Sequence, residues 1–260
     1  MKRIINGIIE YNEELVPGIR RMVVQAPEAA SEAKAGQFVN IYPKAESTLL
    51  PRPLSVCDAD AGAGTVTIIY RIVGKGTREF AGYEKGTTLR MSTPLGNGYD
   101  LAGVKDSAVL VGGGLGVPPL IMLAKVLIAA GVKVTVVLGF RDYIFLTDEM
   151  EAAGARLFIA TECETDRPGV VKGNALDLIK MNSLTAANYF ACGPRPMLKS
   201  LTEYLAAQGS DAQLSMEERM GCGYGACVGC VCTVIEDGMK IRRKVCIDGP
   251  VFWGSGVVWE

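Results

Sequence analysis

The sequence contains no histidine. This absence excludes serine–histidine–aspartate and cysteine–histidine catalysis, haem held by histidine, Rieske clusters and histidine-bound zinc. A chain without imidazole as acid, base or ligand is expected to delegate its chemistry to bound cofactors. The missing residue type therefore directs attention to the groups that the chain can hold.

Two further features are missing: a surplus of one charge and a long apolar run. The formal net charge is −1 over 260 residues, of which 49% are hydrophobic and 21% charged. This ordinary globular composition does not indicate binding to nucleic acid or to an anionic membrane. No run of about 18 apolar residues occurs, and the start, M-K-R-I-I, lacks a cleavable signal pattern. We expect a cytoplasmic protein with no nucleic-acid or membrane partner.

Cysteine, by contrast, is concentrated near the end of the chain. Cys222, Cys227 and Cys230 follow the pattern C-x4-C-x2-C, and Cys246 comes after fifteen further residues. This is the thiolate spacing of plant-type [2Fe–2S] sites, in which three ligands share one tight loop and a distant fourth completes the set. Four glycines give such a loop freedom and space: Gly221, Gly223, Gly225 and Gly229. The spacing therefore predicts a metal site with four cysteine ligands.

Other uses of these cysteines stay open at this point. Structural zinc also takes four cysteines, but usually as two C-x2-C knuckles, and only one is present here. A disulfide framework is not expected in a cytoplasmic chain of this size. Cys232 lies two positions beyond Cys230 on an extended segment, so we interpret it as a neighbour of the site and not as a ligand.

The first hundred residues favour an antiparallel barrel. Short runs of β-branched and apolar residues alternate with turns that contain proline, glycine and aspartate. The expected strands are 2–11, 19–25, 38–42, 54–57 and 66–72. Many short strands at this spacing are typical of a small closed barrel.

The pattern changes after Lys105 to strands that alternate with helices. The expected strands are 107–111, 132–140, 156–161 and 189–192, with helices near 118–130, 146–153, 174–180 and 196–208. This alternation predicts a parallel, doubly wound sheet. We therefore divide the chain into a barrel domain (1–102), an α/β nucleotide domain (103–214) and a cysteine-rich tail (215–260).

Two motifs of the α/β part lie where ligands bind in open sheets. Gly112, Gly113, Gly114 and Gly116 follow a strand and open a helix, so backbone N–H groups could meet a pyrophosphate there. The loop departs from G-x-G-x-x-G, because Val117 takes the place of the third glycine, and a plain strand–helix turn is the alternative. Cys192-Gly193-Pro194 ends the fourth strand at the same edge.

Two motifs of the barrel combine cations with tight turns. Arg52-Pro53-Leu54-Ser55 places a cation, a rigid turn and a hydroxyl within four residues, although a strand entry with a surface arginine would look the same. The segment Y-R-I-V-G-K-G-T at 70–77 runs from a strand into two glycines and a helix start. That second segment is a possible phosphate cradle.

Taken in order, these motifs resemble the ferredoxin–NADP reductase superfamily and, more closely, the electron-transfer subunits of type B dihydroorotate dehydrogenase. The resemblance covers essentially the whole chain. Its most specific part is the tail, where R-M-x-C-G-x-G-x-C-x-x-C at 219–230 precedes V-C-x-D-G-P-V-F at 245–252.

The resemblance implies a role for each motif. It implies FAD in the barrel, NAD(H) on the α/β domain, and a [2Fe–2S] cluster on the four cysteines. Arg52 would meet the FAD pyrophosphate and Ser55 the flavin ring, while Cys192 would lie beside the nicotinamide as the one candidate catalytic side chain. The remaining implied cofactor contacts are Pro53, Leu54, Ile69, Tyr70, Arg71, Gly76, Thr77, Gly112, Gly113, Gly114, Gly116, Gly193 and Pro194.

The resemblance also implies a partner subunit that holds FMN and oxidises dihydroorotate, in a heterotetramer with two copies of each subunit. Electrons would pass from dihydroorotate through FMN, the cluster and FAD to NAD+, in the synthesis of UMP. A cluster that carries single electrons suits a position between two flavins.

Two departures limit this resemblance. Many superfamily members have an aromatic residue where Leu54 stands, so one stacking partner of the flavin is missing. NADP-dependent relatives tend to carry Ser-Arg at the end of the third strand, where this chain has Thr161-Glu162. The Glu162 carboxylate would repel a 2′-phosphate and accept a ribose hydroxyl, which predicts NAD, although nearby Arg167 could favour the phosphate.

Two other interpretations stay open on sequence alone. The chain could be the small subunit of another cluster-bearing NAD(P)H reductase, of the ferredoxin:NADP oxidoreductase or sulfide dehydrogenase type. Those relatives often use a non-cysteine cluster ligand, whereas four cysteines are available here. A non-enzymatic binding module with structural zinc would instead be colourless.

Overall fold

Short alternating strands close the first part of the chain into a barrel. The computed structural model describes residues 2–259, so the terminal residues of the predicted segments 1–102 and 215–260 lie outside it. Six antiparallel strands follow the order β1-β2-β5-β4-β3-β6. They are β1 (Ile4–Val16), β2 (Ile19–Gln25), β3 (Phe38–Ile41), β4 (Arg52–Asp60), β5 (Thr65–Arg71) and β6 (Thr88–Ser92). The barrel prediction is confirmed, but it lacked β6 and the short helix α1 (Pro27–Glu32).

Alternate side chains of β5 face the barrel core and the neighbouring domain. Val66, Ile68 and Tyr70 point into the barrel core, whereas Ile69 points outward and packs against the α/β domain. A second short helix, α2 (Lys75–Ala81), follows β5 and buries Phe80 against Tyr70. The barrel thus has its own core and one wall that it shares with the next domain.

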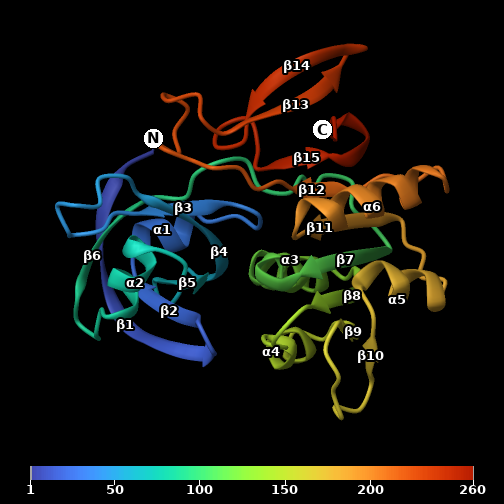
Figure 1. Ribbon diagram of the computed structural model, residues 1–260, viewed down its shortest axis with the longest axis horizontal. Coiled ribbons are helices and arrows are strands. Elements are labelled where there is room, and N and C mark those ends of the chain that lie inside the picture. Colours follow the sequence, from blue (N-terminus) through green and yellow to red (C-terminus); the bar gives the residue numbers. More distant parts are fainter. Residues whose placement is uncertain (1, 260) are drawn as a thin grey trace.

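The α/β domain is built on a seven-stranded sheet with the order β10-β9-β8-β7-β11-β12-β15 (Figure 1). Its parallel strands are β7 (Ser107–Gly113), β8 (Lys133–Phe140), β9 (Arg156–Thr161), β10 (Val170–Lys172), β11 (Asn188–Cys192) and β12 (Gln213–Ser215). The strand order reverses between β7 and β11, as in a doubly wound sheet, so this prediction is confirmed. Short strands β10 and β12 were not predicted.

Helices cover both faces of this sheet. α3 (Pro118–Ala129) and α4 (Thr147–Ala152) pack on one face, and α5 (Ala175–Met181) and α6 (Arg195–Ala206) pack on the other (Figure 1). Strand β7 serves both, because Ala108 and Leu110 belong to the α3 side and Val109 and Val111 to the α6 side. An apolar run without alternation is what a strand buried on both faces requires.

Helix α3 also joins the α/β domain to the barrel. Ile19, Cys57 and Ile69 of the barrel share one buried cluster with the α3 side chains. Two ion pairs border that contact, Lys125 with Asp58 and Arg21 with Glu149. Because the apolar contact is continuous, the two domains hold a fixed relative orientation.

The tail leaves the sheet and returns to it. A hairpin of β13 (Val231–Glu236) and β14 (Met239–Lys244) projects at the top of Figure 1. Its turn at Asp237-Gly238 has positive φ at both residues, +50° and +75°, as two-residue hairpins favour. β15 (Val251–Trp253) then adds an antiparallel edge strand beside β12, and the 3-10 turn η2 (Gly254–Gly256) follows. The tail is therefore anchored in the sheet at both of its ends.

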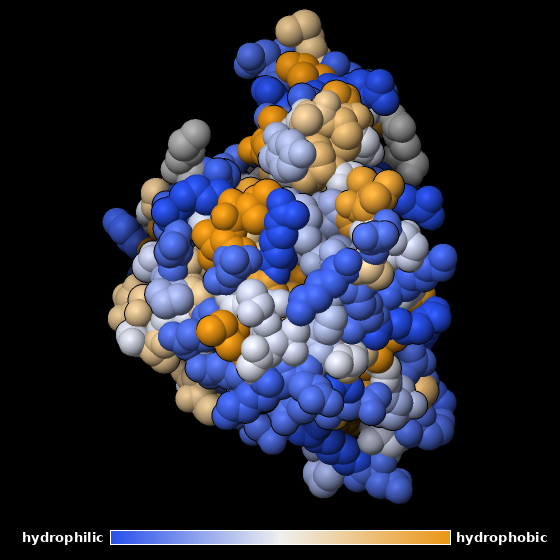
Figure 2. All heavy atoms as spheres, turned by 90° about the vertical axis from the view of Figure 1, so that its left-hand side faces the viewer, coloured by the Kyte–Doolittle hydropathy of each residue, from blue (hydrophilic) through white to orange (hydrophobic). Residues whose placement is uncertain are grey.

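The surface matches a protein whose apolar residues are mainly internal. Hydrophilic residues cover most of the barrel side, with scattered apolar patches between them (Figure 2). Leu49, in the loop before β4, is 88% exposed. Across residues 2–259, every helix is too short or too polar to cross a membrane.

Candidate cofactor crevice and cysteine loop

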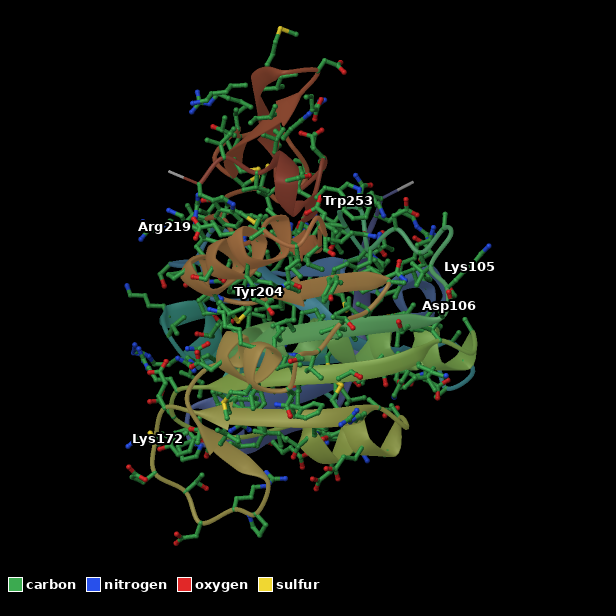
Figure 3. All side chains as sticks on the ribbon, turned by 90° about the vertical axis from the view of Figure 1, so that its right-hand side faces the viewer. Lys105, Asp106, Lys172, Tyr204, Arg219 and Trp253 are labelled. Carbon is green, nitrogen blue, oxygen red and sulfur yellow. The ribbon has the colours of Figure 1, made fainter. Side chains whose placement is uncertain are left out.

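The parallel strands of the sheet end on one side of the molecule. In Figure 3, Lys105 and Asp106 mark the side where β7 starts, and Lys172 of β10 and Arg219 of the tail lie on the opposite side. A cavity of about 990 Å³ opens there between the sheet and the barrel. That volume is at the upper end of the range for ligand pockets, roughly 300–1,000 Å³.

Most of the predicted cofactor residues meet in this one crevice. Those that line it are Arg52, Pro53, Leu54, Ser55, Ile69, Tyr70, Arg71, Thr77, Gly113, Gly114, Gly116, Glu162, Cys192, Gly193 and Pro194. Gly76 and Gly112 lie directly behind its wall: Gly76 packs against Arg52, and Gly112 packs against Leu120 of α3. The crevice thus joins motifs that are up to about 140 residues apart in the sequence.

On the barrel side, one glycine makes room for one cation. A Cβ at Gly76 would lie 2.7 Å from Nε of Arg52, so only glycine leaves the guanidinium its place beside the start of α2. Arg52 Nη1 also donates to the carbonyl of Leu50 at 2.8 Å. The hydroxyl of Thr77 accepts the N–H groups of Val73 and Gly74 at 2.9 and 3.1 Å. A fixed cation above an ordered turn is a suitable arrangement for a pyrophosphate.

The crevice contains an aromatic side chain that sequence reasoning missed. Phe38 of β3 lies opposite Ser55 of β4 in the barrel register, and both line the crevice. Leu54 is not aromatic, and Phe38 supplies an aromatic side chain to the barrel wall of the crevice, whereas the Tyr70 ring points into the barrel core. The alternation along β3, where Val39 and Ile41 face the barrel core, was the available signal.

On the sheet side, the glycine loop and the Cys192 loop are in backbone contact. A Cβ at Gly116 would lie 2.1 Å from the carbonyl oxygen of Cys192, and one at Gly113 would lie 2.9 Å from Cδ of Pro194. Gly114 between them adopts φ +51°, in the left-handed region that favours glycine. The missing side chains therefore let two loops meet at the point where the strand order reverses.

Cys192 is a neutral thiol in this position. Burial raises its pKa to about 12, while the Ser215 hydroxyl acts in the opposite direction and Glu217 raises it further. A thiol with such a raised pKa is protonated at neutral pH and is therefore a poor nucleophile. Its chemical capacity here is to pack against a ligand and to donate a weak hydrogen bond.

The carboxylate and the cation predicted near the nucleotide separate in space. Glu162 lines the crevice, and its N–H donates to the carbonyl of Phe140 at 3.0 Å. Arg167 instead donates to the Thr147 hydroxyl at 2.9 Å and lies outside the crevice lining. Arg141, which the sequence analysis did not select, lines the crevice on the sheet side, in addition to Arg52 and Arg71 on the barrel side.

The cysteine loop has no regular secondary structure between residues 216 and 230. Gly223 and Gly225 adopt φ +79° and +87°, and Val228 adopts +56°. Gly221 and Gly229 act differently, since a Cβ at either would lie within 3.5 Å of the Cys227 sulfur. Gly223 and Gly225 therefore allow the turns of the loop, and Gly221 and Gly229 lie in close contact with the thiol of Cys227.

The four predicted ligands form two pairs. The Cys222 sulfur accepts the N–H of Cys227 at 3.4 Å, and the buried thiols of Cys230 and Cys246 contact each other. Burial raises the pKa of Cys222, but backbone N–H groups of Cys227, Tyr224 and Ala226 outweigh it and lower that pKa to about 7. The pKa of Cys246 is raised to about 12, mainly by burial and then by the neighbouring thiol of Cys230. Within residues 2–259, no three candidate ligands already converge on one ion position.

The donor chemistry of the loop fits an iron–sulfur cluster. All four donors are sulfurs, and backbone N–H groups point at one of them, as clusters require. Cys232 is a buried residue of hairpin strand β13, and burial raises its pKa to about 11. The loop is also continuous with the crevice, because Glu218 and Met220, just before Cys222, line it.

Comparisons with known proteins agree with both sites. Residues 217–258 match the family described as the iron–sulfur cluster binding domain of dihydroorotate dehydrogenase B. The electron transfer subunit of dihydroorotate dehydrogenase B (NAD(+)) from Fusobacterium nucleatum is 39% identical over 261 residues, which cover 97% of each chain. The subunit of the same description from Geobacillus kaustophilus is 46% identical over 228 residues, 86% of each chain.

Solved structures show the same architecture. An NADH-dependent reduced ferredoxin-NADP oxidoreductase, studied for flavin-based electron bifurcation, matches with a TM-score of 0.86 and 28% identity over 97% of this chain and 90% of that one. A ferredoxin NADP+ reductase from Neisseria gonorrhoeae with bound FAD and NADP has a TM-score of 0.62 at 19% identity, covering 79% and 92%. The second likeness concerns the fold alone.

The resemblance drawn from the motifs is therefore confirmed over nearly the full length of the chain. The chain is an oxidoreductase subunit and belongs to the family of electron transfer subunits of NAD(+)-dependent dihydroorotate dehydrogenase B.

Proposed function

We propose that this chain receives electrons from a partner subunit that oxidises dihydroorotate and delivers them to NAD+. The observation that carries the proposal is a shared wall: the crevice with the flavin and nucleotide motifs is bordered by the segment that enters the cysteine loop. When bound, FAD would supply hydride exchange with nicotinamide and one-electron exchange with an iron–sulfur cluster. The partner would hold FMN, and two copies of each subunit would assemble.

The barrel wall would hold FAD. The Arg52 guanidinium would neutralise its pyrophosphate, since Gly76 leaves that cation a fixed place at the start of α2. Ser55 would hydrogen-bond the edge of the flavin ring, and Phe38 would exclude water beside it. The close contact between Gly76 and the Arg52 guanidinium supports this assignment.

The sheet wall would hold NAD(H). Gly113, Gly114 and Gly116 would present backbone N–H groups to the pyrophosphate. Cys192 would pack beside the nicotinamide as a neutral thiol, and Glu162 would accept a ribose hydroxyl. The tail would hold the [2Fe–2S] cluster through Cys222, Cys227, Cys230 and Cys246.

One further function has a specific observation in its favour. The solved NADH-dependent ferredoxin-NADP oxidoreductase matches at a TM-score of 0.86, so a subunit of that kind would use the same three sites with another partner. Its identity of 28% is below the 39–46% of the dihydroorotate dehydrogenase subunits named above. The higher identities favour the dihydroorotate-linked function.

The deciding experiment is anaerobic co-purification with the dihydroorotate oxidase encoded nearest in the genome, followed by an assay of dihydroorotate-dependent NAD+ reduction. We expect reduction only when both chains are present, with FMN on the partner and FAD and iron on this chain. Reduction by reduced ferredoxin, without any by dihydroorotate, would favour the second function. A colourless chain that binds zinc would contradict both.

A further inference from the structure

The barrel and the cysteine loop are joined by one buried amide. Asn40 of β3 is 1% exposed, and its Nδ2 donates to the carbonyl oxygen of Cys222 at 2.8 Å, across 182 residues of sequence. The backbone N–H of Asn40 donates to the Ser92 hydroxyl of β6 at 2.9 Å. The backbone of Asn40 is therefore held within the barrel, and its side chain reaches the first predicted cluster ligand.

The same strand forms part of the flavin wall. Phe38 and Asn40 point out of the barrel, whereas Val39 and Ile41 between and after them belong to its core. Phe38 lines the crevice opposite Ser55, and Asn40 lies opposite Pro53, another residue of the crevice. Strand β3 thus presents one side chain to the crevice and the next outward one to the cysteine loop.

The contact between Asn40 and the loop is tight. A Cβ at Gly223 would lie 2.5 Å from Nδ2 and 2.8 Å from Oδ1 of Asn40, so glycine is required there for space as well as for its φ of +79°. Within the described residues, Oδ1 of Asn40 is buried and has no hydrogen-bond donor. An unsatisfied buried acceptor costs roughly 1–3 kcal/mol. Within the described residues, the donation to Cys222 is thus the one hydrogen bond that the Asn40 side chain makes to the protein.

We propose that Asn40 is a positioning residue for the iron–sulfur cluster. Its amide holds the Cys222 carbonyl, and with it the first thiolate, against the strand that also carries the flavin wall. This inference rests on the proposed function, because it needs the cluster to be bound. It assigns to this hydrogen bond the placement of Cys222 relative to the flavin wall.

The test compares two barrel-side asparagines that both donate to the tail. Asn97 is exposed, and its Nδ2 donates to the carbonyls of Ile247 and Asp248 at 2.9 and 3.1 Å, next to but not on a predicted ligand. Asn97→Ala therefore removes a tail anchor of the same chemistry. Asn40→Ala removes the contact to Cys222, and Asn40→Asp keeps the volume but replaces the donor by an acceptor that the carbonyl repels.

The cluster is reconstituted anaerobically in each purified chain, and the readouts are the EPR spectrum of the dithionite-reduced cluster and the rate of iron release to a chelator. FAD content and melting temperature report folding separately. We expect iron release about tenfold faster in Asn40→Ala and Asn40→Asp, with shifted EPR g-values, because changes beside metal ligands typically cost 10–100-fold. Asn97→Ala should match the wild type in both readouts.

A double variant sharpens the test. Gly223→Ala pushes a methyl group into Asn40, so Asn40→Ala should partly relieve it, and the two effects should not add. Wild-type behaviour of both Asn40 variants, or an equal effect of Asn97→Ala, would overturn the inference and leave the proposed function standing. A wild-type chain that takes up FAD but no iron would overturn the cluster assignment itself.

Discussion

The crevice and the cysteine loop are adjacent but differently built. The crevice is walled by strands in two hydrogen-bonded sheets, with glycines where loops approach one another. The cysteine loop has no helix or strand from residue 216 to 230 and contains three positive φ values. Its carbonyls are tied to the rest of the chain by Asn40 at Cys222 and by Lys244 at Gly225.

This difference shows how each site obtains its geometry. The fold itself preorganises the crevice, because its wall residues sit on elements that exist for packing reasons. Three of the four predicted ligands lie on a segment without helix or strand, so we expect metal binding to contribute to the order of the loop. The flavin site should therefore tolerate loss of the cluster better than the cluster loop tolerates loss of its ligands.

The largest expected effect comes from removing a ligand. Cys227→Ser should abolish retention of the cluster and lower dihydroorotate-dependent NAD+ reduction by more than about 100-fold, beyond the 10–100-fold typical of changes around a ligand. FAD binding and NADH-to-dye activity should remain. Iron content, visible absorbance and the two activities are measured, with Cys163→Ser, an exposed cysteine outside the loop, as the control. Joint loss of FAD and iron would contradict the independence of the two sites.

The reciprocal change removes Arg52, the crevice cation that packs against Gly76. Arg52→Ala should weaken FAD binding by about 10–100-fold, since a hydrogen bond to a charged group contributes roughly 1.5–3 kcal/mol. Arg52→Lys keeps the charge without the planar fork and should be intermediate. Fluorescence titration of FAD into the apoprotein measures the affinity, and iron content should not change. An unaltered FAD affinity would contradict the pyrophosphate role of Arg52.

A smaller effect is expected on the preference for NADH over NADPH. Glu162→Gln removes the carboxylate that would repel a 2′-phosphate, so the ratio of kcat/KM for NADPH over NADH should rise about tenfold, or ~1.4 kcal/mol. Glu164→Gln is the matched control, because Glu164 pairs with Lys172 and does not line the crevice. The same change in both variants would indicate a general charge effect and contradict a specific role for Glu162.

Local sequence patterns predicted the architecture and most residues of the crevice wall. Strand periodicity, glycine turns and ligand spacing each depend on residues that are close together in the sequence. They did not predict β15, which returns to the sheet from the tail, nor β6, whose alternation in T-L-R-M-S was overlooked. Phe38 was missed although the alternation along β3 indicated its outward face, and Arg141 was missed because a single residue after a strand carries no signal of what it faces. Asn40 depends on a partner 182 residues away, which only the folded chain reveals.

The smallest predicted effect concerns pH and the loop before Arg52. Glu79 of α2 accepts the N–H groups of Lys44 and Ala45 at 2.6 and 3.2 Å, and the hydroxyl of Tyr83. Burial raises its pKa, but these donors outweigh burial and hold that pKa below its ordinary 4.5. A lowered pKa in the folded state means stabilisation that is present above the unfolded pKa and is lost as pH falls through the folded one.

Acid should therefore loosen the 44–51 loop, and with it the Leu50 carbonyl that holds Arg52. We expect protonation of Glu79 to accelerate FAD release two- to fivefold below about pH 4.5. This factor corresponds to less than ~1 kcal/mol, as expected for a partly exposed site. Glu79→Gln cannot titrate, so it should lose that part of the pH dependence while keeping FAD at neutral pH. Stopped-flow flavin fluorescence measures the release. Identical pH profiles for the wild type and Glu79→Gln would show that titration of Glu79 does not control FAD release.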